Sequence, residues 1–224
     1  MPHLYLVRHG QPDFTGNYDS ITALGASQSR WLGAHFASRG LRFARVASGT
    51  LRRQVDTCDL VALQMTDVPE AVRDARLNEY DHASLLAFFA ADRMQELRVR
   101  GDRRGYFRAI RASLQAWSRH EGALAGGETW TDFGGRIRVV VGELCDGLDR
   151  DDNVLLVSSG GVIGRYAAEV LGAGAEAAIQ LNLQTRNTGV TEVVLAADGV
   201  ARLVAFNAIP HLEVPGRESA STHA

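Results

Sequence analysis

The order of apolar and polar residues along the chain predicts strands that alternate with helices. Residues 4–7 and 153–157 are short, nearly continuous apolar runs, which are typical of strands buried on both faces of a parallel sheet. A further strand is predicted at residues 43–47, and a short one around Val72. Because helical patterns separate these strands, we expect an α/β fold with a mostly parallel sheet flanked by helices.

Helical periodicity is found in several segments between the predicted strands. Toward the carboxyl end, residues 189–195 and 200–206 predict two strands joined by a hairpin turn at Asp198-Gly199. We expect a first helix that ends near Gly40, a helix from Leu51 capped by Thr50, a mostly helical stretch over 83–120 with breaks near Gly101 and Gly105, and helices over 130–148 and 162–171.

The chain is expected to form one domain. Its 224 residues show no internal repeat, low-complexity tract or linker, so a single domain over residues 1–214 is the simplest interpretation. Within it, residues 82–125 predict a helical insertion over the edge of the sheet. The final residues, 215–224, are small and polar, and we expect them to be disordered.

Composition narrows the possible functions. The formal net charge is −2, so the chain lacks the strong field that recruits nucleic acid or an anionic membrane. No apolar run reaches the roughly 18 residues of a membrane span, and no signal peptide is evident. Cys58 and Cys145 lie in helical patterns and predict buried thiols, so we expect a cytoplasmic protein. No heptad or apolar stripe indicates an oligomeric state.

The first strand ends in residues suited to phosphate chemistry. Arg8 and His9 follow the apolar run, and Gly10 and Pro12 predict a sharp turn that leaves both side chains at the tip of the strand. A guanidinium matches phosphoryl oxygens with a planar fork of donors, whereas imidazole is a neutral nucleophile near pH 7. A hydrogen-bonded structural role for His9 is the alternative on these residues alone.

Two other strand tips carry related residues. Arg53 lies in the first turn of the helix that follows the second strand, and residues 158–161 form a serine- and glycine-rich junction after a later strand. The carboxyl ends of parallel strands lie at the same edge of a sheet, so these tips are expected to form one pocket. Two guanidinium groups and a glycine-rich helix start around His9 predict a site for a phosphoryl dianion.

Several motifs in a fixed order resemble one family. Together they resemble branch 1 of the histidine phosphatase superfamily, which includes phosphoglycerate mutase-like enzymes. The resemblance implies a three-layer sandwich with a helical insertion over the active edge. The motifs are Arg8-His9-Gly10, Thr22-x-x-Gly25-x-x-Gln28, Ser48-Gly-x-Leu51-x-Arg53-x-x-x-Thr57, Leu77-x-Glu79, Gly126-Gly-Glu-Thr129 and Val157-Ser-Ser-Gly-Gly161.

The resemblance also implies roles for individual residues. His9 matches the nucleophile that becomes phosphohistidine, and Arg8 and Arg53 match the arginines that hold the phosphoryl oxygens. Glu79 matches the proposed general acid, which protonates the leaving oxygen and then activates water. The arginines perform the electrostatic work, so neither a metal nor another cofactor is implied.

The chain departs from the family pattern at Ser159. The family has a second histidine at this position, before the two glycines, and we expect Ser159 and Gly160 to bind phosphate in its place. A hydroxyl donates one hydrogen bond but carries no charge. One charge at contact distance is worth about 4 kcal/mol at an effective dielectric near 20, so its loss is expected to affect turnover more than binding.

Four other polar residues have open roles. His82 or His211 could replace the missing histidine in space, although a surface or loop position is favoured for both. Glu128 lies in a matching motif without an assigned role. Asn17 is a candidate lining residue, but its spacing from His9 differs by two residues from that of the mutases' asparagine.

Three functions are therefore considered. The first is a phosphomonoester hydrolase that acts through phosphohistidine on a small phosphorylated molecule. The alternative is a weakly active or non-catalytic phospholigand-binding member, because Ser159 replaces the second histidine. The third, a phosphoglycerate mutase-like phosphotransferase, is less favoured because the longer basic insertion and extended tail of the glycolytic enzymes are absent. Specificity is expected to lie within residues 81–108.

Overall fold

The computed structural model describes residues 1–224 except 15, 91–102, 121–122, 124–126, 197–199 and 224. Six strands form one sheet in the order β3-β2-β4-β1-β5-β6. The pairs β1–β4, β2–β4 and β2–β3 are parallel, whereas β5 runs antiparallel to β1 and β6. The strands are β1 (His3–Arg8), β2 (Arg45–Ser48), β3 (Val72–Arg73), β4 (Asn153–Ser158), β5 (Val190–Leu195) and β6 (Ala201–Ala208).

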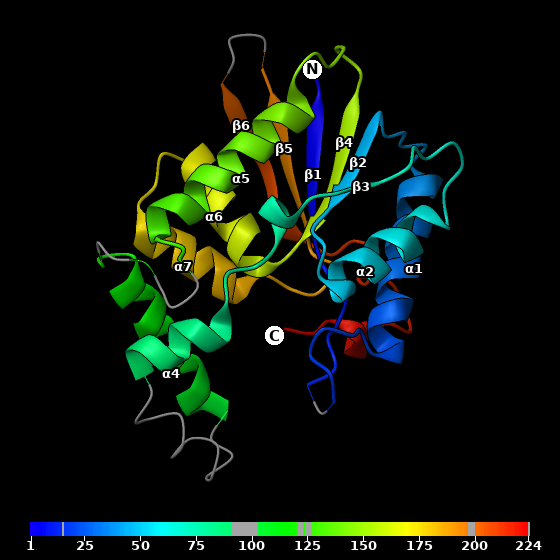
Figure 1. The fold of residues 1–224 in the computed structure, drawn as a ribbon. Coiled ribbons are helices and arrows are strands. Elements are labelled where there is room, and N and C mark those ends of the chain that lie inside the picture. Colours follow the sequence, from blue (N-terminus) through cyan, green and yellow to red (C-terminus); the bar gives the residue numbers. More distant parts are fainter. Residues whose placement is uncertain (15, 91–102, 121–122, 124–126, 197–199, 224) are drawn as a thin grey trace.

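Helices cover both faces of the sheet. Figure 1 shows α1 and α2 on one face and α5 and α6 on the other, so the expected three-layer α/β architecture is confirmed. No helix in the described ranges is long and apolar enough to cross a membrane. Residues 82–90 are also helical, next to residues outside the described ranges. The named α-helices are α1 (Ala23–Ser38), α2 (Arg52–Ala62), α4 (Arg103–Trp117), α5 (Trp130–Cys145), α6 (Gly160–Val170) and α7 (Ala175–Gln184), and the 3-10 helices are η1 (Ala75–Leu77) and η2 (Glu218–Ala220).

The apolar run of β1 supplies both layers of the core. Leu4 and Leu6 pack with residues of α5 and α6 on one face, whereas Tyr5 and Val7 pack with residues of α1 and α2 on the other. Side chains alternate between the faces of a strand, so an unbroken apolar run is what a doubly covered central strand requires. The burial of β1 fixes the position of the residues at its carboxyl end and just beyond it.

Several element boundaries differ from those predicted. Helix α2 begins at Arg52, and Thr50 does not cap it; instead the Asn78 side chain accepts from the backbone N–H groups of Thr50 (2.7 Å) and Leu51 (3.3 Å). Helix α6 begins two residues earlier than expected, and α7 was not predicted. A local pattern could not reveal Asn78 as a partner for this loop.

The predicted helical insertion is partly described. Residues 82–90 and α4 are helical, and α4 continues through Gly105, where a break was expected. A single glycine inside a helix costs only about 1 kcal/mol, which packing can offset. The expected break at Gly101 and the expected turn at Asp198-Gly199 lie outside the described residues. Strands β5 and β6 pair antiparallel, as predicted.

The carboxyl-terminal segment differs from the disordered tail that we expected. Residues 215–223 include η2, and Ala220 is buried. The amide of Gln28 donates to the Ala220 carbonyl (2.7 Å) and to the Thr222 hydroxyl (2.9 Å), and His223 forms a β-bridge with Arg186. Hydrogen bonds from distant elements therefore order a segment whose own composition predicts disorder.

A substitution at Gly164 tests the close contact between α6 and α7. A Cβ at this position would lie 2.5 Å from the Asn182 backbone nitrogen and 2.8 Å from the Ala178 carbonyl oxygen. Because backbone atoms cannot move aside cheaply, we expect Gly164→Ala to lower the free energy of unfolding by about 1–3 kcal/mol. Urea denaturation followed by circular dichroism measures this change.

Gly135, inside α5, is the matched control. A Cβ there meets no described atom within 4 Å, so Gly135→Ala should leave stability unchanged or raise it by up to about 1 kcal/mol through helix propensity. Equal effects of the two substitutions would contradict the close packing of α6 on α7.

Candidate active site

A cavity of about 700 Å³ lies where β1, β2 and β4 end. Arg8, His9, Arg53 and Glu79 all line it, so the structure brings together the four residues predicted to be catalytic. These strands are neighbours in the sheet, and Arg8 pairs in register with Ser158. Figure 1 shows α4 beyond the same edge, and residues of α4 complete the wall.

The turn after β1 is held by contacts on several sides. The Gly10 N–H donates to the Thr57 hydroxyl (2.9 Å), and the Asn187 amide donates to the His9 carbonyl (3.2 Å). A Cβ on Gly10 would lie 2.6 Å from the Gly25 carbonyl oxygen, so the turn can approach α1 only with glycine. These contacts place His9 without using its side chain.

The motif from Thr22 to Gln28 supports the loop between β1 and α1. Thr22 caps α1 by accepting from the Gly25 N–H (3.0 Å) and also donates to the Gln11 side chain (2.8 Å). Gln28 accepts from the Gln11 N–H (2.9 Å). Phe14 and Tyr18, farther along this loop, line the cavity. The motif therefore shapes one wall of the site.

His9 is buried, neutral and oriented. Its Nδ1 lies 2.8 Å from the Gly10 carbonyl oxygen, and the Arg53 Nε–H donates to His9 Nε2 at 3.3 Å. This pattern requires the proton on Nδ1 and leaves Nε2 unprotonated, with its lone pair accepting from Arg53. Burial, followed by the charges of Arg8 and Arg53, lowers the pKa of His9 well below its usual value. Nε2 is therefore unprotonated, which is the state that a nucleophile requires.

The two arginines form a cationic surround for His9. Arg53 donates to Asp19 (2.8 Å) and lies 5.0 Å from the centre of the Tyr18 ring. Arg8 donates to the Thr185 carbonyl, and its buried Nε has no hydrogen-bond partner among the described residues. Arg8 lines the cavity, and a buried guanidinium with an unused donor is suited to an anion.

Glu79 is held by backbone amides. Its carboxylate accepts from the N–H groups of Gly161 (2.9 Å) and Tyr80 (3.2 Å). A Cβ on Gly161 would lie 2.1 Å from Glu79 Oε1, so glycine at the start of α6 allows this contact. Burial raises the pKa of Glu79, and it outweighs the opposing effects of the amides and arginines. A carboxyl group with a raised pKa is suited to donate a proton.

Glu128, which had no assigned role, supports the segment that carries Glu79. It pairs with Arg136 at 2.5 Å, and Arg136 also donates to the carbonyls of Arg76 (2.5 Å) and Asn78 (2.7 Å). The pair thereby fixes the backbone immediately before Glu79. The sequence motif indicated that this position mattered but not what it contacts.

Ser159 and Gly160 lie outside the described lining of the cavity. The Ser159 hydroxyl accepts from the Gln54 amide (2.8 Å), a partner that the sequence analysis missed. A Cβ on Gly160 would lie 2.8 Å from the Asn182 side-chain oxygen, so glycine here serves the contact with α7. The assignment of both residues to phosphate binding stays a prediction.

The remaining candidates, His82, His211 and Asn17, lie at different places in the structure. His82 lines the cavity, and burial and the nearby arginines lower its pKa to about 4, so it is neutral at pH 7. His211 lies elsewhere: it is buried, contacts the Thr188 hydroxyl (2.8 Å) and lies outside the described cavity lining. Asn17 is exposed and accepts from the Asp19 N–H (3.0 Å). Asn182, which the sequence analysis missed, lines the cavity.

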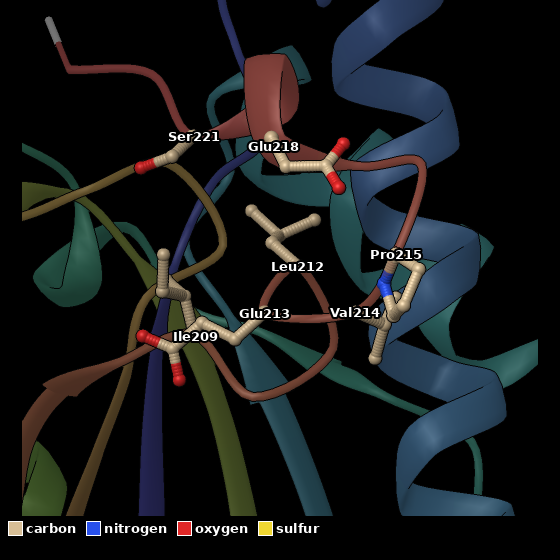
Figure 2. Close-up of a pocket in the computed structure, with 7 residues that line it drawn as sticks. All are labelled: Ile209, Leu212, Glu213, Val214, Pro215, Glu218 and Ser221. Carbon is tan, nitrogen blue, oxygen red and sulfur yellow. The ribbon is translucent and has the colours of Figure 1, made fainter.

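A second cavity, of about 390 Å³, differs in chemistry. Figure 2 shows it beside α1, with Leu212 near its centre. It contains two carboxylates, and its described lining includes no arginine or histidine, so it does not suit a phosphoryl group. Its lining residues are Ile209, Leu212, Glu213, Val214, Pro215, Glu218 and Ser221.

Fold and site together define an α/β protein with a neutral histidine between two arginines at the carboxyl edge of its sheet. The chain belongs to the histidine phosphatase superfamily (branch 1), whose family model matches residues 4–209. The predicted family and fold are thus confirmed.

Individual proteins are similar to this chain at low sequence identity. A 2,3-bisphosphoglycerate-dependent phosphoglycerate mutase from Methylorubrum populi is 33% identical over 114 residues, which cover 46% of this chain and 54% of the mutase, about half its length. Two solved structures share the fold. Phosphoserine phosphatase from Entamoeba histolytica in complex with 3-phosphoglyceric acid has a TM-score of 0.66 at 20% identity, over 95% of this chain and 100% of the other. A mycobacterial glucosyl-3-phosphoglycerate phosphatase with inorganic phosphate has a TM-score of 0.62 at 24% identity, over 93% and 98%.

The contacts of Arg53 predict a loss of anion affinity in Arg53→Lys. Lysine keeps the charge but cannot donate to His9 and Asp19 through a rigid fork, so we expect inorganic phosphate to bind at least about tenfold more weakly, a loss of about 1.4 kcal/mol. Isothermal titration calorimetry measures this affinity. Arg52→Lys is the control, because Arg52 is largely exposed and pairs with Asp56. Unchanged affinity in Arg53→Lys would exclude Arg53 from the phosphate site.

Proposed function

We propose that this protein is a phosphomonoester hydrolase that acts through a phosphohistidine intermediate on a small phosphorylated substrate. One observation carries the proposal: the Nδ1 of His9 is bound to the Gly10 carbonyl, so its buried Nε2 is unprotonated and accepts a hydrogen bond from Arg53, with Arg8 nearby. A histidine that only stabilised the fold would not need this orientation toward a cavity.

In the first step, His9 Nε2 forms a bond to phosphorus while the bond from phosphorus to the alcohol oxygen breaks. Glu79 donates its proton to that oxygen, and the alcohol leaves. Arg8 and Arg53 interact with the phosphoryl oxygens as charge develops on them. The raised pKa of Glu79 supports this assignment, because the step requires a protonated carboxyl group.

In the second step, water attacks phosphorus and the bond to His9 Nε2 breaks. The Glu79 carboxylate accepts the proton from water, so inorganic phosphate is released and the enzyme returns to its starting state. The N–H groups of Gly161 and Tyr80 hold the carboxylate ready for this role. Each proton that leaves Glu79 in the first step is therefore replaced in the second.

Ser159 favours a second candidate function, a phospholigand-binding protein with little or no turnover. Its hydroxyl is engaged by Gln54, and neither group carries a charge. The neutral His82 on the cavity wall adds no charge at pH 7 either. On this alternative the arginines bind phosphate, but the transition state lacks a third cation.

His9→Ala distinguishes these two functions. We expect wild-type protein to release phosphate from 4-nitrophenyl phosphate and the variant to lose at least about 10³-fold in kcat, because the nucleophile is absent. Phosphate affinity should persist in the variant, since both arginines remain. Acid-labile, alkali-stable radiolabel on wild-type protein would identify phosphohistidine.

His120→Ala serves as the control, because His120 is exposed and lies outside the described cavity lining. Wild-type turnover in His9→Ala would refute the mechanism. Phosphate binding without turnover in the wild type would favour the binding protein, and loss of activity with a chelator would contradict the metal-independent mechanism.

The raised pKa of Glu79 predicts that the rate of hydrolysis falls at higher pH, which forms the descending limb of the pH–rate profile. Catalysis requires its protonated form in the first step, so the rate should fall as pH rises through that pKa. Glu79→Gln should remove this limb and slow hydrolysis by about 10²-fold or more, with a larger loss for benzyl phosphate than for 4-nitrophenyl phosphate, whose leaving group needs less protonation. Glu70→Gln, at an exposed position, is the control. Equal losses for both substrates would argue against Glu79 as the acid.

A further inference from the structure

Aromatic side chains form much of the cavity wall. Phe14 and Tyr18 line it from the loop between β1 and α1, with ring centres 5.3 Å apart, and Tyr106 and Phe107 line it from α4. Phe14 is 53% exposed although it is a large apolar residue. Aromatic side chains that meet solvent at the rim of a cavity are typical of ligand contacts.

The region next to Glu79 is also aromatic. Tyr80 is buried, and its ring centre lies 4.4 Å from that of His82. The Tyr80 hydroxyl accepts from the Asn182 side chain (3.1 Å), so its polar atom is engaged. Because His82 is neutral at pH 7, this ring pair presents an uncharged surface to the cavity.

The charges around the cavity are distributed unevenly. Arg8 and Arg53 are the cationic side chains in its described lining, and both lie next to His9, where the phosphoryl group must be held. The other charged lining residues are Glu79 and Asp81. Asp81 accepts from the Ala83 N–H (2.9 Å) and the Ser84 hydroxyl (2.6 Å), which lower its pKa and keep it ionised.

From this distribution we propose that the natural substrate is a phosphomonoester of an aromatic alcohol that carries no second anionic group. The inference rests on the proposed function of the same cavity. The phosphoryl group occupies the two arginines, and the aromatic walls stack against the leaving group. A carboxylate or a second phosphate would face the ionised Asp81, whereas a neutral or cationic substituent would not be repelled.

Three alkyl phosphates test the inference without large differences in leaving-group chemistry: benzyl, 4-carboxybenzyl and propyl phosphate. We expect kcat/KM for benzyl phosphate to exceed that of each of the other two by at least about tenfold. Binding of benzylphosphonate and 4-carboxybenzylphosphonate, measured by calorimetry with wild-type protein and His9→Ala, should show the same preference without any turnover.

Two variants assign the preference to named residues. Phe107→Leu should lower the ratio of kcat/KM for benzyl over propyl phosphate at least about fivefold, while Phe88→Leu should leave it unchanged, because Phe88 is exposed and lies outside the described cavity lining. Asp81→Asn, which can still cap the following helix, should reduce discrimination against 4-carboxybenzyl phosphate at least about threefold.

The outcomes separate this inference from the proposed function. Hydrolysis that depends on His9 but is equally fast with propyl or 4-carboxybenzyl phosphate would overturn the substrate class and leave the hydrolase intact. No hydrolysis, with selective binding of benzylphosphonate, would refute the hydrolase and support the ligand class. Phosphonate binding without selectivity, or no binding at all, would overturn the substrate class whatever the turnover.

Discussion

The hydrogen bond from His9 Nδ1 to the Gly10 carbonyl is the interaction on which the site depends. It decides which imidazole nitrogen keeps its lone pair, and burial, together with the surrounding cations, keeps that nitrogen unprotonated. A backbone carbonyl can do this only if the turn after β1 is rigid. Thr57 and Asn187 form hydrogen bonds to the turn, and Gly25 packs closely against it. The fold thus supplies, through one short turn, both the orientation and the protonation state of the proposed nucleophile.

Charge balance is the second constraint. Two buried guanidinium groups near one another are costly unless anionic groups offset them, and Asp19 lies against Arg53 while Glu79 lies within electrostatic reach of both. The glycine-rich start of α6 contributes by donating an amide to Glu79. Where the family pattern has a further histidine, this chain has the neutral contact between Gln54 and Ser159. The resulting site contains fewer positive charges than the family pattern predicts.

The sequence predicted the features that depend on local pattern and on strand order. The apolar runs identified β1 and β4, and the rule that parallel strand ends share an edge brought Arg8, His9 and Arg53 into one cavity, with Glu79 added by resemblance. Features that depend on distant partners were missed or placed differently. Gly160 looked like a phosphate-binding glycine but is close to Asn182, and the tail looked disordered because its partner, Gln28, lies 192 residues away from Ala220. The role of Ser159 depended on Gln54, which no motif had singled out.

Gln28 connects two segments that are far apart in the sequence. Its oxygen accepts from Gln11, two residues beyond His9, and its nitrogen donates to Ala220 and Thr222. During synthesis the residues around His9 leave the ribosome long before residues 220–222, yet this side chain can complete its contacts only after those residues have emerged. The loop that carries Phe14 and Tyr18 therefore acquires its full support only after residues 220–222 have been synthesised.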